Sequence, residues 1–115
     1  MAIGDAPVLE ALADINAVSI ARTELDERTL LLVRLAALAS VDAPAASYLM
    51  HIGPAAEAGL TIEDVQDVLV AVAPIAGAPR TLAAAGKITD ALGLAVAIIE
   101  MADAEDTANG AKTAV

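Results

Sequence analysis

The chain has 115 residues, a net charge of −10 and no cysteine. This length suits one domain, and the acidic charge opposes binding to nucleic-acid phosphates and to anionic membrane surfaces. Without cysteine there is no disulfide, no thiolate metal site and no thiol redox chemistry.

The apolar residues are numerous but small. The composition is 58% hydrophobic and 1% aromatic. Tyr48 is the single aromatic residue, and alanine is the most frequent hydrophobic residue. Alanine buries little area, and aromatic side chains normally supply much of a small core. We therefore expect a thin core in the isolated chain and a homo-oligomer that shares apolar faces between subunits.

The first half of the chain shows helical spacing throughout. A first helix is predicted from Asp5, with Pro7 in its first turn. Its apolar stripe follows the helical period: Val8, Leu9, Leu12, Ile15 and Val18. A second, buried helix is predicted from Asp26 to a break at residues 40–44, where Pro44 disfavours helix in the residue before it.

The second half is predicted to hold three more helices. A third helix towards Ala58 should kink or break at Pro54. A capping-box pattern at residues 61–64 opens a fourth, and a hinge at residues 74–79 leads to a fifth that runs to about Met101. The expected fold class is therefore all-α with about five main helices. Residues 1–102 form one domain, and residues 103–115 an acidic, flexible tail.

Two further expectations concern the last helix and the membrane. Gly86 and Gly93 indicate either close approach of another backbone or tolerated defects on a solvated face. The longest uncharged stretch, residues 43–56, is shorter than the roughly 18 apolar residues of a membrane-spanning helix. No basic segment precedes an apolar run at the N-terminus, so we expect no signal peptide, no membrane association and a cytoplasmic protein.

The order of several motifs resembles the carboxymuconolactone decarboxylase and AhpD-like family. The motifs are Asp26-Glu27-Arg28 with the apolar run to Ala39, then His51, then residues 58–65, then Gly77-Ala78-Pro79 before an alanine-rich helix. The resemblance covers residues 26 to about 92. It implies an AhpD-like helical subunit that assembles as a homotrimer or as a hexamer made from trimers.

The redox branch of that family carries two cysteines with two residues between them, and a histidine four residues after the second cysteine. Aligning that histidine with His51 places Pro44 and Ser47 at the cysteine positions, and Leu32 where the branch has a glutamate. A thiol peroxidase requires a thiolate. We therefore predict that this chain is not a thiol peroxidase and that it resembles the cysteine-free branch.

That branch handles small lactones or keto acids, and the resemblance implies no metal and no other cofactor. His51 is the candidate catalytic acid or base, because imidazole exchanges protons near neutral pH. Arg34 or Arg80 is the candidate for holding a substrate carboxylate. Tyr48 and Ser47 share the helix face of His51 and are candidate substrate-binding residues.

Each candidate also has a structural interpretation. His51 can be a half-buried histidine bonded to a backbone carbonyl, Tyr48 a core filler, and Ser47 a hydroxyl bonded back to its own helix. Arg34 can pair with Glu27 or Asp42, or reach an oligomer interface. Arg80 lies at a helix start and can either stabilise the fold or bind an anion.

Two functions therefore remain open from the sequence. The first is a small-molecule lyase, isomerase or ligand binder with a small acidic metabolite as partner and His51 as acid or base. The second is a catalytically silent homo-oligomeric scaffold that kept the helices and lost the chemistry. Nucleic acid is excluded as a partner in both cases.

Overall fold

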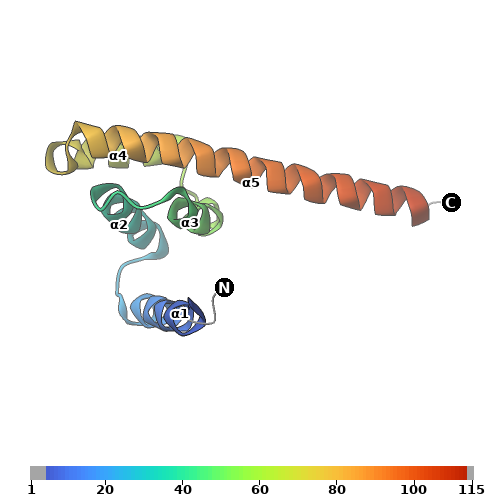
Figure 1. Cartoon of the computed structure of the whole chain (residues 1–115), viewed down its shortest axis with the longest axis horizontal. Coiled ribbons are helices and arrows are strands. Elements are labelled where there is room, and N and C mark those ends of the chain that lie inside the picture. Colours follow the sequence, from blue (N-terminus) through green and yellow to red (C-terminus); the bar gives the residue numbers. More distant parts are fainter. Residues whose placement is uncertain (1–4, 114–115) are drawn as a thin grey trace.

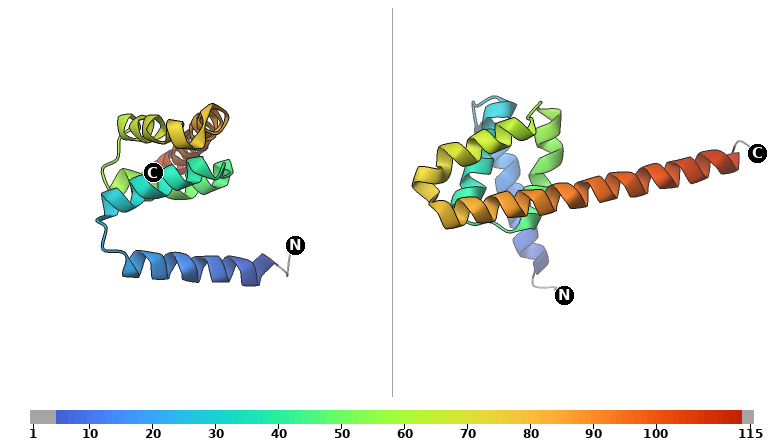
Figure 2. Two further views of the ribbon diagram at one scale, coloured as in Figure 1. Left: turned by 90° about the vertical axis from the view of Figure 1, so that its left-hand side faces the viewer. Right: turned by 90° about the horizontal axis from the view of Figure 1, so that it is seen from above.

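Five α-helices make up the part of the chain that the computed structural model describes, which is residues 5–113 (Figure 1). They are α1 (Asp5–Arg22), α2 (Glu27–Ser40), α3 (Ala45–Glu57), α4 (Ile62–Ala76) and α5 (Ala78–Thr113). Helices α4 and α5 form one layer, α2 and α3 form a second layer beneath it, and α1 lies below both (Figures 1 and 2). The predicted all-α class is confirmed.

Local hydrogen bonds explain where two of the helices begin. The Asp26 carboxylate accepts a 2.7 Å bond from the Thr29 amide at the start of α2. At the start of α4 the Thr61 hydroxyl accepts from the Asp64 amide, and the Asp64 carboxylate accepts from the Thr61 amide. These contacts satisfy amides that have no partner within the helix, as the sequence predicts.

The expected interruption at Pro54 is wrong, because α3 continues through this residue to Glu57. Proline removes one helical bond, here the one to the carbonyl of Met50, an exposed residue that water can reach. Pro74 likewise lies inside α4, so only Gly77, with φ of +88°, separates α4 from α5. The turn between these helices is therefore much shorter than the hinge predicted at residues 74–79.

The predicted end of the last helix near Met101 is also wrong, because α5 continues to Thr113. Residues 103–113 are thus helical, where the sequence suggested a flexible tail. The segment after Met101 is rich in alanine, which favours helix. Its last turns project beyond the other helices (Figure 2), and the molecule measures 59 Å along its longest axis.

The surface of α5 is apolar along much of its length. Six of its large apolar side chains are exposed: Leu82, Leu94, Val96, Ile98, Ile99 and Met101. Gly86 and Gly93 are exposed as well, and a Cβ built on either would meet nothing within 4 Å. The close backbone approach suggested by these glycines is therefore absent within the described residues.

By length and composition alone, α5 could cross a membrane. An 18-residue window within Ala78–Ala108 has a mean hydropathy of 1.7 and at most two charged residues. The uncharged run inside it, between Asp90 and Glu100, is shorter than a bilayer span requires. This is weak evidence for membrane insertion, and the expected cytoplasmic location stays a prediction.

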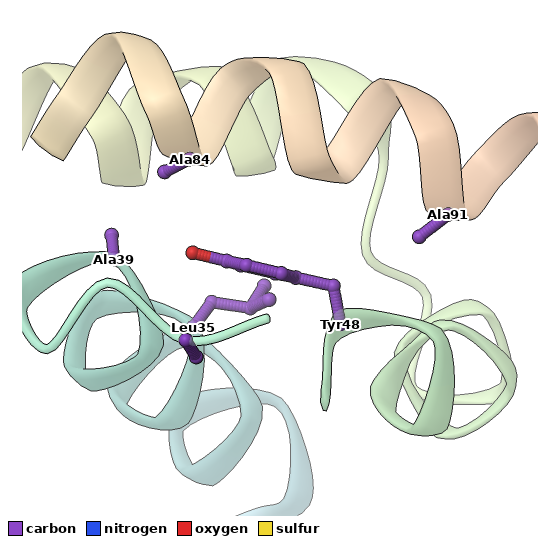
Figure 3. Close-up of a cluster of buried hydrophobic side chains, with 6 residues drawn as sticks. Leu35, Ala39, Tyr48, Ala84 and Ala91 are labelled. Atoms are coloured by element: carbon purple, nitrogen blue, oxygen red, sulfur yellow. The ribbon is translucent and has the colours of Figure 1, made fainter. Parts of the chain in front are cut away.

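Tyr48 lies at the centre of a small core between α2, α3 and α5. Its ring extends from α3 between Leu35 and Ala39 on α2 and Ala84 on α5 (Figure 3). Among the described residues, Tyr48, Leu35 and Leu31 are the large side chains that are buried; the other buried hydrophobic residues are alanines. The core of the single chain is therefore thin, as its composition predicts.

Polar contacts from α5 and α2 hold the loop and the layers together. The Arg80 guanidinium donates a 2.7 Å bond to the carbonyl of Ser40 at the end of α2. Lys87 forms a 2.7 Å ion pair with Asp42, the one non-glycine residue of the described chain with positive φ. Arg28 pairs with Asp64 at 2.8 Å and joins α2 to α4. The contacts of Arg80 and Lys87 fix the α2–α3 loop beneath α5.

Helix α1 lies apart from the other four. No Cα atom of α1 comes within 8 Å of a Cα atom in another helix, and its residues are exposed from Ala6 to Arg22. Between α1 and the α2–α3 layer lies a cleft of about 700 Å³, lined mainly by apolar side chains. The guanidinium of Arg34 crosses it and donates to Asn16 Oδ1 at 2.5 Å and Ser19 Oγ at 3.0 Å.

The capping box makes stability sensitive to acid. The Thr61 amide, which donates to the Asp64 carboxylate, lowers the pKa of this group below its ordinary value of 3.8. Its stabilising contribution is complete above the unfolded-state pKa and is lost as pH falls through the lower, folded-state pKa. We expect Asp64→Asn to lower the melting temperature near pH 7 and to make little difference near pH 2.

The measurement is the melting temperature by circular dichroism from pH 7 to pH 2. The matched control is Glu63→Gln, which removes the same charge from the same helix turn without breaking a capping contact. An equal, parallel shift for both variants at every pH would contradict the assignment.

Candidate functional site

An apolar cavity of about 240 Å³ lies between α3, α4 and α5. Most of its wall is aliphatic, with Leu35 from α2 and Ile52, Val65, Leu69, Ile88 and Leu92 from the surrounding helices. Five polar side chains also line it: Tyr48, His51, Thr61, Gln66 and Thr89. A mainly apolar cavity with a few polar groups is the usual form of a small-molecule site.

His51 is positioned by its own helix. Its Nδ1 atom lies 2.7 Å from the backbone carbonyl oxygen of Ser47, one turn earlier in α3. A carbonyl oxygen only accepts hydrogen bonds, so in neutral His51 the proton resides on Nδ1 and Nε2 is an acceptor. Nε2 forms no hydrogen bond within the described chain. The side chain is half-buried and lines both the cavity and the α1 cleft.

The geometry of His51 fits both interpretations of the sequence. The bond to a backbone carbonyl is the one that a structural histidine would make. The same bond fixes the ring and its tautomer while leaving Nε2 unbonded beside a cavity, which is what a general base requires.

Ser47 contributes its backbone rather than its hydroxyl. The hydroxyl forms no hydrogen bond with any part of the chain that the structure describes, so the expected bond to its own helix is absent. Since Nδ1 of His51 contacts a carbonyl and not a carboxylate, no acid orients the ring as in a Ser–His–acid triad. Ser47 lines neither the cavity nor the α1 cleft.

Tyr48 belongs to the core and to the inner wall of the cavity. The side chain is 1% exposed, and its hydroxyl is the buried polar atom that lacks a hydrogen-bond partner among the residues described. Burial, and to a smaller extent the charge of Asp42, raises the pKa of this phenol above its ordinary value. Tyr48 therefore remains neutral and fills space, and its hydroxyl lies near Ala39 and Ala84 (Figure 3).

The two candidate arginines are not brought to His51's cavity. Arg34 lies in the α1 cleft, where it bonds to Asn16 and Ser19. Its expected pairing with Glu27 or Asp42 is not formed, because the ion pairs of the described chain are Arg28–Asp64 and Lys87–Asp42. Arg80 bonds to the carbonyl of Ser40. Neither arginine lines the cavity.

The site offers no preformed metal centre. Within residues 5–113, no three of the side chains of histidine, aspartate and glutamate lie close enough together to hold a metal ion. The polar groups of the cavity are a single imidazole, an amide and hydroxyls. These groups can donate and accept hydrogen bonds, and the imidazole can also exchange a proton.

A comparison with protein-family models identifies the family. The model of the carboxymuconolactone decarboxylase family matches residues 6–90, which is well over half of the chain. The chain belongs to the carboxymuconolactone decarboxylase family. No curated protein and no solved structure matches it significantly.

The match covers all of α1 and the first part of α5. Helix α1 is thus part of the carboxymuconolactone decarboxylase-family domain even though it packs on no other helix of its own chain. Nearly the whole cavity also falls within the family domain, with Leu92 just beyond it.

Two polar residues of the cavity were missed by sequence reasoning. Gln66 follows Val65 on α4, and Thr89 follows Ile88 on α5, where its hydroxyl donates to the carbonyl of Ala85 at 2.9 Å. Their only signal is an uncharged polar residue next to an apolar one. That signal is common on amphipathic helices, and only the packing of α4 and α5 against α3 makes it part of a site.

Replacing Tyr48 separates its packing from its hydroxyl. We expect Tyr48→Phe to leave the free energy of unfolding unchanged or to raise it by up to about 1 kcal/mol, because a buried hydroxyl without a partner is unfavourable. Tyr48→Ala should lower it by about 3–5 kcal/mol. Urea unfolding followed by circular dichroism measures both. A loss above about 1 kcal/mol for Tyr48→Phe would show that the hydroxyl has a partner in solution.

Proposed function

We propose that this member of the carboxymuconolactone decarboxylase family is a small-molecule lyase, isomerase or ligand binder that uses His51 as acid or base. The observation that carries the proposal is the geometry of His51. Its Nδ1 is held by the Ser47 carbonyl at 2.7 Å, and its Nε2 remains unbonded in the described chain at a cavity of about 240 Å³.

The proposed chemistry is proton transfer at a carbon next to a carbonyl group, as in a lactone or keto compound. In isomerisation, Nε2 of His51 takes the proton from carbon, the C–H electron pair forms an enolate, and the imidazolium returns the proton elsewhere. In decarboxylation, the C–C bond breaks, carbon dioxide leaves, and protonated His51 delivers a proton to the enolate carbon. Gln66 supplies amide hydrogens that can stabilise the enolate oxygen.

Thiol peroxidase activity is excluded by composition. The chain has no cysteine, and peroxide reduction by this route forms its new S–O bond on a thiolate. Any carboxymuconolactone decarboxylase-family chemistry here therefore uses side chains other than thiols.

Hydrogen exchange provides a test that does not require the natural substrate. In D₂O, the protein should accelerate deuterium incorporation next to the carbonyl of a small cyclic ketone such as 2-tetralone, followed by proton NMR. We expect His51→Gln to reduce this rate at least about 100-fold, in line with the usual contribution of a general base.

The control is Glu57→Gln, an exposed change on the same helix, which should retain the wild-type rate. Both variants should keep the wild-type melting temperature within a few degrees. Equal exchange rates for wild type and His51→Gln would reject the acid–base role.

We also propose that the chain is a homo-oligomer, a trimer or a hexamer, and helix α1 supports this. Its large apolar side chains are about as exposed as on an isolated helix, from 51% for Val18 to 65% for Ile15. Isolated helices of this length are marginal in water, and each large side chain gains about 1.5–3 kcal/mol from full burial. A second copy packed on α1 and its cleft supplies that burial.

The same observation favours the second candidate function, a catalytically silent scaffold. The exposed apolar side chains of α1 and of α5 form a surface that suits assembly, and assembly does not require chemistry at His51. An oligomer without measurable proton exchange would decide for the scaffold.

Assembly can be tested on α1 directly. We expect Leu12→Glu combined with Ile15→Glu to convert the wild-type assembly to monomers in sedimentation velocity, because charges placed in an apolar interface lose hydration. The matched control is Val70→Glu, a residue of α4 that is 72% exposed, which should leave the assembly intact. A monomeric wild-type protein would contradict the proposal.

A further inference from the structure

We propose that the His51 cavity binds an uncharged small molecule that presents a hydroxyl or enol hydrogen to Nε2, and that it discriminates against carboxylates. This inference deepens the proposed function and rests on the cavity being the functional site. It differs from the expectation that an arginine holds a substrate carboxylate. Of the reactions in the proposed function it favours isomerisation or ligand binding over decarboxylation, because the substrate of a decarboxylation carries a carboxylate.

The first argument is the position of the cationic side chains. None of those that the structure describes lines the cavity. Arg28 and Lys87 are paired with the carboxylates of Asp64 and Asp42, and Arg80 is bonded to a backbone carbonyl. Arg34 is held in the other cleft by Asn16. With a net charge of −10 on the chain, the surrounding field also opposes the entry of an anion.

The second argument concerns the start of α4, where Thr61 and Ile62 line the cavity. A helix N-terminus normally favours anions through its free amides and its dipole. Here the Asp64 carboxylate already bonds to the Thr61 amide at 2.9 Å, and the Thr61 hydroxyl bonds to the Asp64 amide. Two of the amides at this helix start are thus already bonded to side chains of the protein, and the Asp64 carboxylate, itself paired with Arg28, lies where an external anion would bind.

The third argument is what the cavity does offer. Nδ1 of His51 is hydrogen-bonded to a carbonyl oxygen, so the neutral imidazole offers the ligand only an acceptor, Nε2. A ligand that bonds to Nε2 must therefore carry a hydrogen-bond donor. The side-chain amide of Gln66 can donate a hydrogen bond to a carbonyl or ether oxygen of the ligand. The aliphatic wall suits an apolar body, and 240 Å³ exceeds the roughly 150 Å³ cavity known to hold benzene.

The test compares two probes with equal numbers of non-hydrogen atoms, 4-ethylphenol and benzoate, by calorimetry and by the ¹⁵N signals of the His51 ring. We expect 4-ethylphenol to bind the wild-type protein at least about tenfold more tightly than benzoate and to shift the Nε2 signal. His51 is the single histidine of the sequence, so its signals need no further assignment.

Changing one residue should reverse the preference. Gln66→Arg places a guanidinium at the cavity wall, and we expect benzoate to gain at least tenfold in affinity through charge-assisted hydrogen bonds. Gln66→Met, which is similar in size and uncharged, is the matched control and should still prefer the phenol.

The outcomes separate this inference from the proposed function. A wild-type protein that binds benzoate as tightly as 4-ethylphenol, with shifted His51 signals, would overturn the inference and leave the cavity as the site. No binding of either probe and unmoved His51 signals would overturn both. Preference for the phenol that survives Gln66→Met and reverses in Gln66→Arg would establish the inference.

Discussion

The packing of one tyrosine between alanine-rich helices is the contact on which the rest of the structure depends. Tyr48 fills the space where α2, α3 and α5 meet, in a chain whose other buried side chains are mostly alanines (Figure 3). This packing brings α5 close to α3, and α4 follows because only Gly77 separates it from α5. The cavity beside His51 lies between these three helices, with a wall made mainly of large aliphatic side chains.

Electrostatics organises the two sides of the molecule differently. On one side, Arg80 and Lys87 of α5 hold the end of α2 and the following loop through Ser40 and Asp42. On the other, the His51 cavity receives no cation and borders the acidic start of α4. Arg28, Arg80 and Lys87 thus fix the fold, while the polar groups described at the cavity are uncharged side chains and the imidazole of His51.

The detached α1 links the fold of one chain to its assembly. It lies within the segment that matches the carboxymuconolactone decarboxylase family, and in the described chain its side chains are hydrogen-bonded to the bundle through Arg34, which donates to Asn16 and Ser19. His51 lines the α1 cleft as well as the cavity. Any subunit packed into that cleft would therefore lie next to the proposed catalytic residue, so that assembly and chemistry share one region.

The sequence by itself determined the helical class, the capped starts at Asp26 and Thr61, the family and the absence of thiol chemistry, because each depends on residues close together in the chain or on composition. It also singled out His51, whose anchoring bond spans one helix turn. Only the tertiary structure decided that Arg34 and Arg80 lie outside the cavity between α3, α4 and α5 while Gln66 and Thr89 line it. Which long side chain reaches which space depends on how α3, α4 and α5 pack, and helical periodicity shows which face of a helix is apolar but not which helix it meets.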